Sequence, residues 1–162
     1  MPTITDTTKA FIAKLQALYD IEKQLEKALP KLAKAAAHPE LAAGFRMHLA
    51  QTKEHSERLE ELFELLEVKP KKMKAEGVRG IIADGEWVIG VDAPSAVKDV
   101  MLAAAARYAE HYEMAGYLSA IAQAHALGLT DATVILTKTL NEEKAADEIL
   151  ASAMAQNLSN AA

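Results

Sequence analysis

The chain has 162 residues, no cysteine and a formal net charge of −5, and 33 of its residues are alanine. Because alanine favours helices and aromatic residues make up only 5% of the chain, the composition excludes an all-β protein. The lack of cysteine excludes disulfides, thiol catalysis and iron–sulfur clusters. The acidic balance argues against nucleic acid as a partner, and the longest apolar run, residues 100–106, is far too short for a membrane span.

Helix signals divide most of the chain into four long stretches. Pro39 suits the first turn of the second stretch, and Gly128 can adopt the left-handed conformation that ends the third. Only a few residues join the first stretch to the second and the third to the fourth, so each pair is expected to form an antiparallel hairpin. Together they make one domain, 1–162, with predicted helices over about 7–36, 39–67, 95–126 and 130–158.

The connection between the two hairpins, residues 68–94, is much longer than the other two. It is long enough to run the length of a bundle, and its apolar residues indicate a short amphipathic helix. One long crossover between two helical hairpins is typical of ferritin-like bundles. The sequence therefore predicts an all-α, ferritin-like four-helix bundle whose crossover carries a short helix.

The inward stripe of each long predicted helix is apolar at both ends and polar near its middle. Helix midpoints lie at one height in a bundle with short hairpin loops, and each midpoint here is close to a polar residue. We therefore expect the interrupting side chains to converge on one layer of the core. They are Glu22, His55, Glu110 and Glu143, with Glu113 and Asp147 one turn away from the last two.

Buried carboxylates must be protonated, paired or bound to a cation. Five inward acids exceed what Arg107, on the third stripe, could balance, whereas two divalent cations would balance them closely. Carboxylate and imidazole ligands suit iron or manganese. The sequence thus predicts a site for two divalent ions, with no catalytic residue assigned. The predicted metal ligands are Glu22, His55, Glu110, Glu113, Glu143 and Asp147.

Each of these residues also has a plain structural interpretation. A single inward glutamate can belong to an ion pair, a lone histidine can be a hydrogen-bonded core residue, and two acids one turn apart can lie at a solvated surface. His48 is interpreted as a core residue or a support behind the ligands, and whether Gln51 or Glu54 joins the site stays open. The coincidence of four polar residues at one level favours the metal hypothesis.

Several stretches of the chain resemble the bacterial YciF-like family. The more specific ones are Glu-His-Tyr-Glu at 110–113 and Glu-Glu-Lys-x-x-Asp at 142–147. The resemblance implies a ferritin-like fold, a dimer, a di-metal carboxylate centre and a role in stress responses, without an established reaction. In the second helix, Ala50 and Gln51 stand where family members often have acids. The other similar stretches are residues 17–25, 48–49, 57–59, 104–109 and 139–141.

The favoured function is a metal-binding, ferritin-like protein of the bacterial stress response, with iron or manganese performing redox chemistry on oxygen or peroxide. Residues 1–6 have neither the basic flank nor the apolar core of a signal peptide, so a cytoplasmic location with no membrane partner is expected. The resemblance implies a homodimer, and the acidic charge predicts no nucleic acid as a partner. A non-enzymatic structural or interaction bundle is the alternative. An iron-storage cage is the third choice, because no extra helix for cage assembly is recognisable.

Overall fold

The computed structural model describes residues 4–161, and within this range every regular element is a helix. The prediction of an all-α bundle with a helix in the crossover is confirmed. Residues 1–3, which belong to the segment that lacks the pattern of a signal peptide, lie outside the described range. The helices are α1 (Thr7–Ala35), α2 (Pro39–Leu65), α3 (Glu76–Gly90), α4 (Ser95–Ala126) and α5 (Thr130–Ala161).

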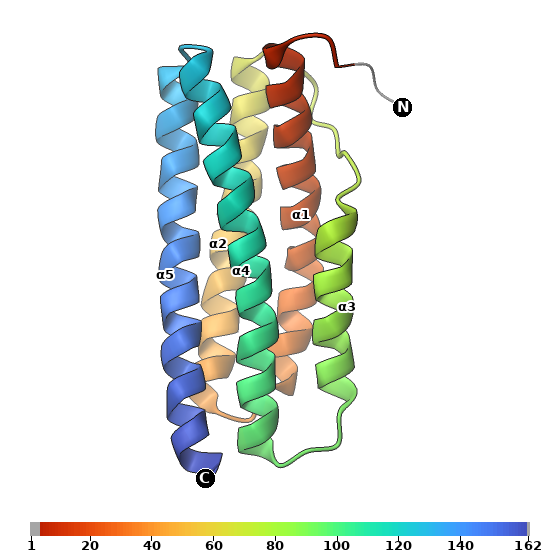
Figure 1. The fold of residues 1–162 in the computed structure, drawn as a ribbon, viewed down its shortest axis with the longest axis vertical. Helices are drawn as coiled ribbons and strands as arrows, with labels where there is room; N and C mark the ends of the chain where they lie inside the picture. The colour runs from red at the N-terminus through yellow and green to blue at the C-terminus, as the bar shows by residue number, and fades with distance from the viewer. Residues whose placement is uncertain (1–3, 162) are drawn as a thin grey trace.

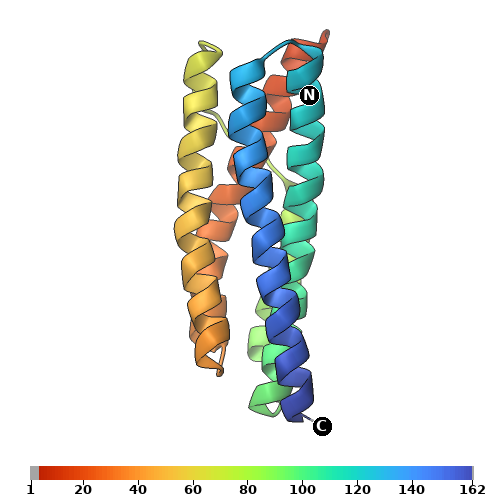
Figure 2. The same cartoon turned by 90° about the vertical axis from the view of Figure 1, so that its left-hand side faces the viewer.

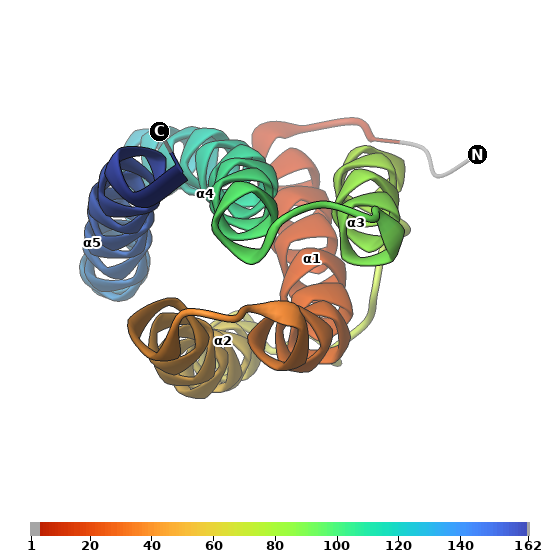
Figure 3. The same ribbon diagram turned by 90° about the horizontal axis from the view of Figure 1, so that it is seen from below.

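The four long helices lie side by side, and α3 runs along the outside of α1 and α4 (Figure 1). The two hairpins α1–α2 and α4–α5 are joined by the long crossover, which returns from one end of the bundle to the other so that α2 and α4 run parallel (Figure 1). Seen from the side, α2 and α5 separate toward the end where α2 begins and α5 ends (Figure 2). The end view in Figure 3 shows the same separation.

Local signals set the helix ends. The side chain of Asp6 accepts a hydrogen bond from the backbone N–H of Lys9 at 2.8 Å and caps α1. Pro39 begins α2, and Gly128 has a φ of 70° in the turn between α4 and α5, as the sequence predicts. The buried carboxylate of Asp99 accepts hydrogen bonds from the backbone N–H groups of Ala37 and His38, at 2.9 and 2.7 Å, and so fixes the α1–α2 turn to α4.

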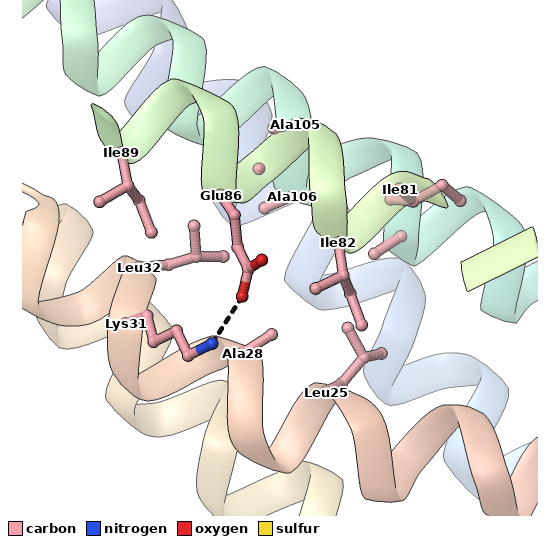
Figure 4. Close-up of a pocket in the computed structure, with 12 residues that line it drawn as sticks. Leu25, Ala28, Lys31, Leu32, Ile81, Ile82, Glu86, Ile89, Ala105 and Ala106 are labelled. Carbon is pink, nitrogen blue, oxygen red and sulfur yellow. Dashed lines mark hydrogen bonds and ion pairs between the residues drawn. The ribbon is translucent and has the colours of Figure 1, made fainter. Parts of the chain in front are cut away.

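Apolar side chains fill the bundle above and below its middle. They include Phe11, Leu15, Phe45, Leu62 and Leu102, each at most 1% exposed. On the outer side, α3 packs on α1 and α4 around an apolar pocket of about 30 Å³, which the Lys31–Glu86 ion pair bridges (Figure 4). Within residues 4–161, none of the helices has both the length and the apolar character to cross a bilayer.

Candidate metal centre

Six acidic and imidazole side chains meet in the middle of the bundle, and all are buried. They form two groups in which one ligand atom from each residue lies within 4.8 Å of the others, a spacing that could hold a metal ion. Glu143 belongs to both groups, so the two form one continuous cluster. The first group is His48, Glu110, Glu113 and Glu143, and the second is Glu22, His55 and Glu143.

The first group joins α2, α4 and α5. His48 Nε2 lies 3.3 Å from Glu110 Oε1 and 3.6 Å from Glu143 Oε2. Neither carboxylate oxygen of Glu113, nor Oε2 of Glu110, has a hydrogen-bond partner among the described residues. The group therefore presents one imidazole nitrogen and several free carboxylate oxygens to one point.

The second group joins α1, α2 and α5. His55 Nδ1 lies 2.9 Å from Glu143 Oε1 and 3.6 Å from Glu22 Oε2. Yet neither His55 Nδ1 nor Glu143 Oε1 is aligned for a hydrogen bond, and the other oxygen of Glu22 accepts one from the hydroxyl of Tyr117. Tyr117 is itself buried and orients Glu22 toward the cluster.

Each histidine turns one ring nitrogen toward the cluster and gives the other nitrogen to a partner outside it. His48 Nδ1 lies 3.4 Å from Gln51 Oε1, and His55 Nε2 lies 2.8 Å from Glu142 Oε2. Arg58 donates two hydrogen bonds to Glu142, at 2.6 and 3.0 Å. Such outer partners fix the tautomer and the ring orientation of metal-binding histidines. Arg58 and Glu142 therefore position His55 with Nδ1 free to bind an ion.

The electrostatics of the cluster reflect its burial. Burial raises the pKa of Glu22, and it raises the pKa values of Glu110 and Glu113 well above the ordinary value, with the neighbouring carboxylates adding to the effect. Burial opposes a charge on His55, but the adjacent Glu143 and Glu22 outweigh it and raise the pKa of His55 to about 10. Burial likewise opposes ionisation of Glu143, but His55 outweighs it and lowers the pKa of Glu143.

The donor set fits metal ions. Unpartnered buried oxygens and nitrogens are costly, and seven such atoms of Glu22, His55, Glu110, Glu113 and Glu143 face this one layer. Ligands at right angles around an ion with bonds of roughly 2.1 Å are about 3 Å apart. The contact of 2.9 Å between His55 and Glu143, without hydrogen-bond alignment, has that spacing. Carboxylate oxygen with imidazole is a donor set that suits iron or manganese.

Five of the six residues that the sequence predicts as ligands lie in this cluster, and Asp147 does not. Arg107 donates hydrogen bonds to both oxygens of Asp147, at 2.6 and 3.2 Å, and His111 Nε2 lies 3.4 Å away. Asp147 lies one turn beyond Glu143 on α5, within reach of the guanidinium of Arg107 on α4. The ion pair between Asp147 and Arg107 takes the place of the predicted contact with the cluster. Among the residues left open, Glu54 is exposed and paired with Arg58, and Gln51 supports His48 from outside.

His48, which the sequence predicts as a core residue or a support behind the ligands, lies inside the first group. Its signal was present, because it precedes His55 by seven residues, two helical turns, on the same stripe. Glu142 had no such signal, since it is next to Glu143 in the sequence and off the inward stripe. Only the fold shows that Arg58 holds it against His55.

Comparisons with known proteins place the chain in a family. The profile of a family described as "Domain of unknown function (DUF892)" matches residues 6–162. Over 148 residues the chain is 39% identical to Protein YciF of Escherichia coli strain K12, and the aligned part covers 91% of this chain and 87% of that protein. The predicted resemblance to the YciF-like family is confirmed.

Solved structures agree with the fold. The crystal structure of the E. coli stress protein YciF matches with a TM-score of 0.93 at 36% identity, over 96% of this chain and 99% of that one. YcfI from Rhodopseudomonas palustris, provisionally described as a structural protein, matches with a TM-score of 0.88 at 36% identity, over 91% and 94%. A Xanthomonas campestris protein, 19% identical, shares the fold with a TM-score of 0.75 over 94% of each chain. The chain therefore belongs to the YciF-like family that the DUF892 profile describes.

Proposed function

We propose that this protein binds two divalent metal ions, iron or manganese, in the buried cluster and serves the bacterial stress response. One observation carries the proposal: buried carboxylate oxygens without partners and one histidine from each of two groups face one another, and Glu143 belongs to both groups. The similarity to a relative named as a stress protein supports the physiological setting.

The chain's own residues have distinct parts in this proposal. His48, Glu110 and Glu113 would hold one ion, Glu22 and His55 the other, and Glu143 would contact both. Iron or manganese would supply redox chemistry with oxygen or peroxide. The apolar bundle ends exclude bulk water from the layer, which strengthens its electrostatic interactions.

Elemental analysis tests the metal site. Wild-type protein purified without added metal, or loaded with Fe²⁺ or Mn²⁺, should hold two ions per chain. Glu143→Gln removes the shared carboxylate and should lose most of both ions. Asp147→Asn is the matched control, because it removes an acid on the same helix that is paired with Arg107 instead. Loss of metal from Asp147→Asn with retention in Glu143→Gln would contradict this assignment.

The redox part of the proposal has its own test. Loaded wild-type protein should consume hydrogen peroxide, or oxidise Fe²⁺ with oxygen, faster than Glu110→Ala at equal metal concentration. Stoichiometric metal binding without turnover of either oxidant would refute the redox chemistry and leave the metal site standing.

A second candidate function, a purely structural bundle, is favoured by the protonation chemistry of the same cluster. Raised pKa values keep protons on Glu110 and Glu113, and a charged His55 pairs with Glu143, so protons alone could neutralise the layer. The provisional description of the R. palustris relative agrees with this reading. A chelator that leaves the melting temperature of freshly purified protein unchanged would support the structural bundle, since a metal that binds only the folded state must stabilise it.

We also propose that the protein works as a homodimer in which each chain holds its own complete centre. All six cluster residues come from one chain, so neither a partner nor a cage is needed to assemble the ligands. Mass measurement in solution should give twice the 17.5 kDa of the chain. A 12-mer or 24-mer would instead support iron storage.

A further inference from the structure

A groove follows the surface between α2 and α5, where these two helices separate (Figure 2). Its volume is about 460 Å³. It is lined by the first turns of α2 and by the part of α5 that follows Glu143. Two carboxylates, Glu40 and Glu148, lie along it, and the described residues that line it include no lysine or arginine. The groove is therefore a largely apolar hollow whose two charged residues are both acidic.

A smaller cavity of about 10 Å³ lies beside this groove, and His48 and Glu110, two residues of the metal centre, form part of its wall. Gly44, Ile149 and Leu150 line both spaces, so the two are adjacent and separated only by these side chains. Among the cluster residues, His48 and Glu110 retain the most exposure, at 5% and 2%. The cluster is thus closest to solvent on the α2–α5 side.

Gly44 and Ile149 line both spaces and face each other between the groove and the cavity, and we call this place the neck. A Cβ placed on Gly44 would lie 3.8 Å from Ile149 Cγ2, which is an ordinary van der Waals distance. Any side chain larger than a methyl group at position 44 would therefore fill the neck. The cavity inside the neck has about the least space that holds one water molecule. Ile149 is 42% exposed, and exposed side chains change rotamer within nanoseconds. Its rotation can widen the neck without unfolding either helix.

The apolar pocket beneath α3 gives a useful contrast. It lies on the other side of α4 and ends on alanines, among them Ala105 and Ala106, with no cluster residue in its wall (Figure 4). Its ionic residues, Lys31 and Glu86, are paired with each other. It offers a cation neither an attracting charge nor a ligand at its inner end.

We propose that the α2–α5 groove is the route by which divalent cations reach the cluster, with Glu40 and Glu148 collecting the ion and Gly44 and Ile149 forming the neck. This inference rests on the proposed metal site. His48 and Glu110, at the end of the route, are the first ligands that an incoming ion meets. Acidic side chains at the mouth raise the local cation concentration and hence the rate of loading.

The test follows the kinetics of Co²⁺ binding to metal-free protein by visible absorption in a stopped-flow instrument. Gly44→Leu fills the neck and should slow both loading and release by on the order of tenfold, leaving the dissociation constant unchanged, because a barrier affects both directions equally. The matched control is Gly85→Leu in the pocket beneath α3, where a Cβ would also meet its neighbour at 3.8 Å. This control should load at the wild-type rate.

Two further variants keep the test decisive if Gly44→Leu does not fold. Ile149→Ala widens the neck and should accelerate loading and release together. Glu40→Gln with Glu148→Gln should slow loading about two- to fivefold at low salt and remove much of its salt dependence. Wild-type loading rates in all of these variants would overturn the route while leaving the metal site intact. Failure of wild-type protein to bind Co²⁺ would instead overturn the metal site and the route with it.

Discussion

Glu143 and Asp147 stand one turn apart on α5, but Glu143 is fully buried whereas Asp147 is partly exposed and has an arginine partner. Arg107 reaches Asp147, holds the pKa of that carboxyl below its usual value and satisfies both of its oxygens. Glu143, in contrast, is paired among the described residues only with His48 and His55 and not with a lysine or arginine. The carboxyls of Glu110 and Glu113 have pKa values well above the ordinary one because they are buried. An acid with its own guanidinium is a structural ion pair, whereas acids buried without one need protons or metal ions.

The largest expected difference between substitutions at Glu143 and at Asp147 is in how much metal removal lowers the melting temperature. At a free metal concentration of about 1,000 times the dissociation constant, binding stabilises the folded state by about 4 kcal/mol. For a domain of this size that raises the melting temperature by roughly 10 °C. Calorimetry with and without chelator should show this difference in wild type and in Asp147→Asn. In Glu143→Gln this difference in melting temperature should nearly vanish. A difference as large as that of the wild type would contradict the contrast between Glu143 and Asp147.

The pH dependence of the metal-free protein is the next test. The pKa of His55 is raised to about 10, and those of Glu22, Glu110 and Glu113 are also raised, so the folded protein holds more protons than the unfolded chain. Above pH 6.5 its stability must therefore fall as pH rises. Below that pH the lowered pKa of His48, which burial causes, acts in the opposite direction. The contribution of His55 is complete below its unfolded pKa near 6.5 and is lost as pH rises through about 10.

Melting temperatures measured from pH 5 to 10 provide the readout. The metal-free protein should lose several degrees over this range. Metal-loaded protein should not, because the ions displace the same protons and bind more tightly as pH rises. A metal-free protein that becomes more stable toward pH 9 would contradict the proton balance of the cluster.

A smaller effect concerns the residues that position His55. Glu142→Gln weakens the partner of His55 Nε2 without touching a proposed ligand, and such outer substitutions cost about 10- to 100-fold in metal affinity. Glu54→Gln is the control, because Glu54 also pairs with Arg58 but is exposed and makes no contact with His55. Titration of metal-free protein with Mn²⁺ should separate the two variants. Equal affinities would mean that Glu142 only balances the charge of Arg58.

The smallest effect is expected at the ion pair itself. Arg107 and Asp147 are partly exposed, with 30% and 14% of their side-chain surface open to solvent. Pairs of this kind contribute about 1 kcal/mol or less, and salt screens them. Denaturant unfolding of Arg107→Gln should therefore show a modest loss of stability that shrinks at high salt, with metal content unchanged. A loss of metal from Arg107→Gln would instead indicate that Asp147 contributes to metal binding.

Most of the fold could be predicted from local patterns in the sequence. Pro39 and Gly128 mark helix ends, the stripes mark inward faces, and the length of the crossover determines which helices run parallel. Periodicity also placed most of the cluster on inward faces. It could not separate Asp147 from Glu143, because both lie on the same stripe and only the position of Arg107 on a different helix distinguishes them. Partners across helices depend on packing, which a stripe does not encode.

The shared position of Glu143 has a consequence for how the two groups behave together. One of its oxygens faces His55 and the other faces His48. Anything that binds in one group changes the orientation and charge of a carboxylate that belongs to the other. The occupancies of the two groups are therefore thermodynamically linked, and the coupling free energy is the same in both directions. A metal titration of this protein should not fit two independent constants, and Glu143 is the residue through which each group senses the other.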